Sequence, residues 1–171
     1  MNGNPMGTVE DYRTGRVLEN IQKALHVFGD REESLTSKAQ AIRIQEKIQE
    51  FEARVLSFSE ASASIRKARK IALGERVCRA LHPKSVSTES VFLDELAEAM
   101  ILSGQARAVS IEDAEGALKK HSCHPLVISK VSGKYQEICA SVPSDCLFWR
   151  AEKRGLHSLK PFAVKSQERE Q

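Results

Sequence analysis

Aromatic residues, prolines and long apolar runs are all scarce in this sequence of 171 residues. Aromatic side chains make up only 5% of it, so aliphatic side chains must fill the core. No run of about 18 apolar residues occurs, and we therefore expect no membrane-spanning helix. The first residues lack the basic and then apolar pattern of a secretion signal, which favours an intracellular protein of the cytoplasm, nucleus or an organelle interior over a secreted one. The five prolines leave room for long helices.

Motifs of the common nucleotide-dependent enzymes are also missing. The sequence contains neither a G-x-G-x-x-G loop nor a G-x₄-G-K-[S/T] loop, both of which cradle phosphates. No carboxylate pair stands out from the surface charge. The four cysteines are expected to remain thiols inside a cell, and Cys139 and Cys146 fall on apolar faces that suit a core. We predict a non-enzymatic protein without a cofactor.

The net charge of +3 is distributed in blocks along the chain. Residues 65–84 contain seven basic residues and one acid, whereas residues 85–117 contain one basic residue and seven acids. Spaced cations on a helix can follow a phosphate backbone, which makes binding of RNA or DNA an alternative function. The acids of the following segment are an equally available partner for these cations. The candidate nucleic-acid contacts are Arg66, Lys67, Arg69, Lys70, Arg76 and Arg79.

An apolar heptad pattern between residues 44 and 65 is the strongest signal in the sequence. Its steps alternate between four and three residues over three heptads, as in a coiled coil. The pattern predicts one long helix from about residues 34–37 to 82, with breaks expected at the serine-rich segment 57–64 or at Gly74. We predict that the seam docks onto a protein partner or a second copy; the alternative is burial in the chain's own core. The seam residues are Ile44, Ile48, Phe51, Val55, Phe58 and Ile65.

Four further segments carry helical signals. Residues 8–28 have a capping Thr8 and an apolar face, and residues 88–102 and 111–120 follow the capping residues Ser87 and Ser110. A last helix is expected after Pro125, with a strand over residues 126–131 as the alternative. The predicted fold class is therefore all-α. A helical hairpin or coiled-coil arm (8–82) joins a small helical domain (88–164), and residues 1–7 and 165–171 form disordered tails.

The distribution of cysteine and histidine suggests a zinc site as a further alternative. Cys78 and His82 are spaced to share one helical face, and His121, Cys123 and His124 follow about 40 residues later. Two such pairs could form a Cys₂His₂ site, with Cys78, His82, His121 and Cys123 as the candidate ligands. The competing explanation is that Cys78 is a small core residue and the histidines end helices. The primary prediction remains a helical adaptor or scaffold subunit that docks through the seam.

Overall fold

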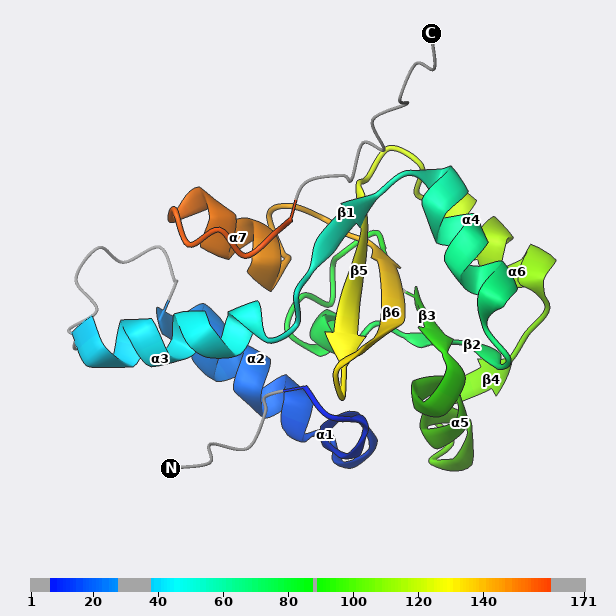
Figure 1. Ribbon diagram of the computed structural model, residues 1–171, viewed down its shortest axis with the longest axis horizontal. Helices are drawn as coiled ribbons and strands as arrows, with labels where there is room; N and C mark the ends of the chain where they lie inside the picture. Colours follow the sequence, from blue (N-terminus) through cyan, green and yellow to red (C-terminus); the bar gives the residue numbers. More distant parts are fainter. Residues whose placement is uncertain (1–6, 28–37, 88, 161–171) are drawn as a thin grey trace, which may run out of the picture.

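A six-stranded antiparallel sheet is the centre of the fold, so the predicted all-α class is wrong (Figure 1). The computed structural model describes residues 7–27, 38–87 and 89–160. The strand order is β1-β5-β6-β3-β2-β4, so strands of both predicted units, 8–82 and 88–164, belong to one sheet. The strands are β1 (Arg54–Leu56), β2 (Ile71–Glu75), β3 (Glu89–Leu93), β4 (Ala106–Ala108), β5 (Leu126–Val131) and β6 (Lys134–Ala140).

Helices cover both faces of the sheet and build three apolar clusters. Helices α4 (Phe58–Lys67) and α6 (Ile111–Lys119) enclose the first cluster on one face. Helices α1 (Val9–Thr14) and α5 (Asp94–Leu102) enclose the second around Phe92 on the opposite face. The third lies among α2 (Arg16–Val27), α3 (Lys38–Gln49) and α7 (Leu147–Lys153). A short 3₁₀ helix, η1 (Val77–Ala80), follows β2.

The predicted long helix and its coiled-coil seam are wrong. Helix α3 ends at Gln49, Glu52 adopts a positive φ of 39°, and the chain then forms the edge strand β1. The serine-rich segment predicted as a break instead begins a helix. Ser57 caps α4, with its hydroxyl accepting from the Glu60 amide and the Glu60 carboxylate accepting from the Ser57 amide. The heptad spacing thus runs by coincidence through a helix, a strand and a second helix.

Of the other predicted elements, some are confirmed and some are wrong. Helix α6 and its Ser110 cap are confirmed, whereas the helix predicted for 88–102 begins as strand β3 and becomes helical only at α5. The first predicted helix is divided into α1 and α2 because Gly15 adopts a left-handed conformation, with a φ of 78°. After Pro125 the strand alternative is the correct one, and Gly133 forms the turn between β5 and β6. No described helix is both long and apolar enough to cross a membrane.

A close approach between β2 and β4 requires glycine at position 74. A Cβ there would lie 2.6 Å from the Gln105 carbonyl oxygen and 2.9 Å from Phe92 Cε2. We expect Gly74→Ala to lower the free energy of unfolding by about 1–3 kcal/mol, because overpacking must shift backbone. The control is Gly116→Ala in α6, whose Cβ would have no neighbour within 4 Å. It should raise stability by up to about 1 kcal/mol. Urea unfolding of both variants checks this; an unchanged midpoint for Gly74→Ala would contradict the tight contact.

Candidate functional site

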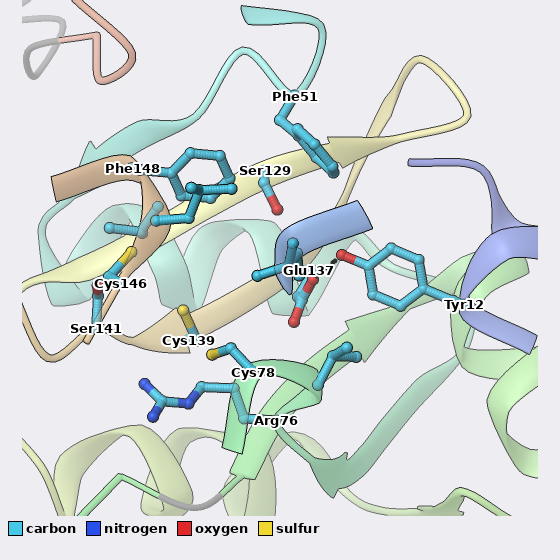
Figure 2. A pocket seen from close by; sticks show the side chains of 14 residues that line it. Tyr12, Phe51, Arg76, Cys78, Ser129, Glu137, Cys139, Ser141, Cys146 and Phe148 are labelled. Atoms are coloured by element: carbon cyan, nitrogen blue, oxygen red, sulfur yellow. Dashed lines mark hydrogen bonds between the residues drawn. The ribbon is translucent and has the colours of Figure 1, made fainter. Parts of the chain in front are cut away.

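A small cavity lies between the sheet and the elements that cover the face opposite α4 and α6 (Figure 2). Its volume is about 60 Å³, which is room for a few water molecules or one very small ligand. Side chains of β5 and β6 contribute to it together with residues from α1, α2, η1 and α7. We call it the Glu137 cavity. It is lined by Tyr12, Ile21, Phe51, Arg76, Val77, Cys78, Val127, Ser129, Glu137, Cys139, Ser141, Cys146, Leu147 and Phe148.

The alternation of side chains along β6 brings a carboxylate into this cavity. Ile138 packs in the cluster beneath α4 and α6, whereas Glu137 faces the cavity and is only 9% exposed. The Tyr12 hydroxyl donates a hydrogen bond to Glu137 Oε2 (Figure 2). The Ser90 hydroxyl donates to Oε1 over 3.0 Å. Burial raises the pKa of Glu137, while the two donors and the charge of Arg76 act in the opposite direction. Each carboxylate oxygen therefore has a protein donor of its own.

Loss of the Tyr12 hydroxyl should be costly because it leaves a buried carboxylate oxygen without its donor. We expect Tyr12→Phe to lower the free energy of unfolding by about 1.5–3 kcal/mol, the range for hydrogen bonds to charged groups. The matched control is Tyr135→Phe, since the Tyr135 hydroxyl donates over 3.0 Å to the neutral carbonyl of Glu52. That change should cost only about 0.5–1.5 kcal/mol. Equal losses in the two variants, measured by chemical denaturation, would show that the hydrogen bond to Glu137 stabilises the fold no more than one to a neutral carbonyl.

Arg76 brings a buried positive charge to the same cavity. The residue is 2% exposed, its Nη2 donates to Ser85 Oγ over 2.8 Å, and its Nε has no hydrogen-bond partner. None of the ion pairs formed by the described residues includes Arg76. Figure 2 shows its guanidinium below Cys139 and Ser141, on the side of the cavity away from Tyr12.

Three of the four free thiols also line the cavity, namely Cys78, Cys139 and Cys146. Burial raises the pKa of Cys78 to about 12, and it also raises the pKa values of Cys139 and Cys146. The thiolate is the nucleophilic form of cysteine, so these thiols are poor nucleophiles at neutral pH. None of the five histidines is among the lining residues, and the cavity thus lacks the usual base for a cysteine nucleophile. The arrangement favours binding over thiol catalysis.

A larger groove of about 350 Å³ adjoins the cavity. Tyr12, Arg76 and Val77 line both spaces, so they form the partition between them. Its other lining residues are Gly15, Val17, Leu18, Glu75, Ala80, Met100, Gly104 and Gln105.

The predicted seam residues do not share one surface. Three of them are buried in the chain's own core, with exposed fractions of 1%, 4% and 0% for Ile48, Phe51 and Ile65. Ile44 and Val55 are half-buried, and Phe58 is 36% exposed. Phe51 contributes to the wall of the Glu137 cavity. A partner could reach only the residues of this set that remain exposed.

The predicted basic helix is divided by the fold, and half of its six charges form ion pairs. Arg66 pairs with Glu115, Lys70 with Glu98 and Arg79 with Glu75, at distances of 3.0, 3.6 and 3.2 Å. Arg76 is buried, as described above. Lys67 and Arg69 are exposed. Glu98 and Glu115, two of the acids after residue 84, are thus intramolecular partners of the basic residues, the alternative that the charge distribution left open.

The four candidate zinc ligands are not assembled into a site. His82 Nδ1 lies 4.0 Å from Asp145 Oδ1, while His121 and Cys123 lie in the turn after α6. Within the described ranges, no group of three or more His, Cys, Asp or Glu side chains is arranged to hold a metal ion. Cys78 instead lies beside Arg76 in the wall of the Glu137 cavity.

Sequence reasoning missed most of the residues of the Glu137 cavity. Tyr12 and Glu137 are 125 residues apart, and nothing in the local pattern of either one indicates the other. A usable signal lies in the segment 126–140, where two strand-like runs flank Gly133. A hairpin interpretation would have placed Glu137 on the same face as Cys139, and so marked it as a candidate buried acid.

Comparison of the chain with protein-family models, curated proteins and solved structures gave no match.

Proposed function

We propose that this chain is a non-enzymatic protein that binds a small molecule in the Glu137 cavity. The observation that carries the proposal is the composition of the cavity, in which apolar and thiol side chains surround a few polar groups at fixed positions. Small-ligand sites are typically built this way, and buried titratable groups in a cavity often mark them. The protonated thiols and the lack of a lining histidine support binding without catalysis.

Amide chemical shifts recorded during titration with small molecules of three to six heavy atoms test the proposal. The largest shifts should fall on residues of β5, β6 and α7 that line the cavity. Ser129→Leu should abolish them, because the Ser129 side chain enters the cavity and leucine would fill it (Figure 2). Ser59→Leu on the exposed surface of α4 is the matched control and should bind as the unchanged chain does. Shifts confined to surface residues, or none at all, would refute the proposal.

A protein-binding role is a second candidate, favoured by the exposed side of α3. Ile42 is 48% exposed there, whereas Ile44 is half-buried against the third apolar cluster. Burial of such side chains stabilises an interface by about 25 cal/mol per Å² of apolar area. Light scattering over a concentration series tests self-association: a stable multiple of 19.0 kDa that Ile42→Asp returns to the monomer mass would support it. A monomer at every concentration would leave only a different partner chain.

Nucleic-acid binding stays a prediction of the sequence. Lys67 and Arg69 are the members of the predicted set that are exposed and form none of the ion pairs described above. Two cations contribute few phosphate contacts, so affinity would be low and would depend only weakly on salt.

A further inference from the structure

The polar groups around the Glu137 cavity are bound or enclosed by the protein itself. Both carboxylate oxygens of Glu137 accept hydrogen bonds, one from Tyr12 and one from Ser90. Arg76 Nε and the Ser141 hydroxyl form no hydrogen bond, but both atoms are enclosed by protein and open no surface to the cavity. The cavity therefore offers a ligand few hydrogen-bonding groups.

Most of the surface that a ligand would touch is hydrocarbon or thiol. Phe51 and Phe148 meet edge to face with their ring centroids 5.6 Å apart, and Leu147 belongs to the same apolar cluster. On the side of the sheet, Val127 of β5 pairs directly with Cys139 of β6, and both line the cavity. A free cysteine behaves as a small apolar side chain. The lining thus favours contact with an apolar ligand.

Charged ligands are disfavoured in this cavity. Glu137 would oppose an anion and Arg76 would oppose a cation, since both residues line the cavity. An ion of either sign would also lose its hydration in a space lined mostly by carbon and sulfur. Ser129 adds an uncharged hydroxyl that enters the cavity from β5 (Figure 2). A molecule with several donors and acceptors would leave most of them unpaired beside this one hydroxyl, which also disfavours polar ligands.

The size of the cavity limits the ligand further. Its volume is about 60 Å³. An apolar cavity of about 150 Å³ holds benzene, so a ligand of the Glu137 cavity must be smaller than benzene.

We propose that the ligand of the Glu137 cavity is a small neutral molecule without hydrogen-bonding groups, held by contact with Phe51, Phe148 and Val127. This rests on the proposed function and assigns its ligand class. The affinity comes from the transfer of apolar surface out of water, which requires neither a charge nor a hydrogen bond. Short hydrocarbons are the molecules of this class that match the volume.

Amide-shift titrations with 2-methylpropene, acetamide and sodium acetate, at constant ionic strength, test this class on the unchanged chain. The three compounds have nearly the same planar, branched shape and differ in polarity and charge. We expect 2-methylpropene to shift the cavity residues, acetamide to bind at least tenfold more weakly and acetate to produce no shifts there. Acetamide or acetate affinity within tenfold of that for 2-methylpropene would overturn the ligand class and leave the proposed function standing. If no compound shifts the cavity residues, both proposals fail.

A valine-to-threonine change in the lining then tests where the ligand lies. Val127→Thr keeps the shape of the side chain but adds a hydroxyl, whose bound water a hydrocarbon would have to displace. It should weaken the binding of 2-methylpropene at least threefold. Val86→Thr is the matched control, because Val86 is 61% exposed, and it should change the affinity less than twofold. A smaller loss in folded Val127→Thr would refute the placement of the ligand. If that variant does not fold, the titrations on the unchanged chain still decide the ligand class.

Discussion

Replacing Ile65 by alanine is expected to lower the free energy of unfolding by about 2–5 kcal/mol, the range for truncating a buried isoleucine. Ile65 is fully buried between α4 and the sheet, where it packs in the cluster that includes Leu73 and Val91. The loss combines the transfer free energy of the missing methyl and methylene groups with a cavity that the rigid sheet cannot close.

The matched control for Ile65→Ala is Ile42→Ala on α3, because Ile42 is 48% exposed. That change should alter stability by no more than about 0.5 kcal/mol. Guanidinium unfolding of both variants makes the comparison. If Ile65 instead belonged to a docking seam, its truncation would reduce association and leave the unfolding midpoint of the monomer nearly unchanged.

Raising the pH from 9 towards 12 is expected to lower the free energy of unfolding. The Cys78 thiol has a pKa of about 12 in the folded chain against an ordinary value of 9.0. Between these values the unfolded chain loses a proton that the folded chain keeps, so stability falls as pH rises. Its contribution is complete below pH 9 and lost through pH 12. At about 1.4 kcal/mol per pH unit it amounts to about 4 kcal/mol for Cys78.

The pH dependence of Cys78→Ala isolates this contribution. Cys139, Cys146 and Tyr12 also have raised pKa values, so part of the alkaline loss will remain in the variant. We expect the curve of stability against pH, obtained from urea unfolding between pH 7 and 11, to be shallower for the variant above pH 9 and parallel to the parent below it. Parallel curves throughout would show that the Cys78 thiol ionises as readily in the folded chain as in the unfolded one.

The sequence supported correct prediction only where local chemistry determines the structure. Ser110 and Thr8 cap the helices that follow them because a side-chain oxygen accepts from the amide three residues later, and this requires no distant partner. The segment 126–131 was the ambiguous case. A short apolar run suits a buried strand and a helix alike, and periodicity cannot separate them.

The missed elements depend on pairing between distant segments. Strand β2 is only five residues long, and its apolar character matches a helix until its pairing with β3 and β4 is known. The heptad pattern misled for the same reason, because Ile48 and Ile65 are buried in different clusters. From the sequence, Arg76 is predicted only as part of a basic surface. Its burial in the Glu137 cavity depends on the packing around η1.

The hydrogen bond from Tyr12 to Glu137 also bears on the order in which the chain can fold. It joins residues 125 positions apart, and β1 pairs in the sheet with the late strand β5. Chains made from the N-terminus therefore expose the Tyr12 ring and the edge of β1 until the β5–β6 hairpin has been synthesised. Such non-local closure slows folding, because the entropy of closing a long loop is lost before the contacts form. The last hairpin thus completes the sheet, and the cavity is closed only when α7 has followed it.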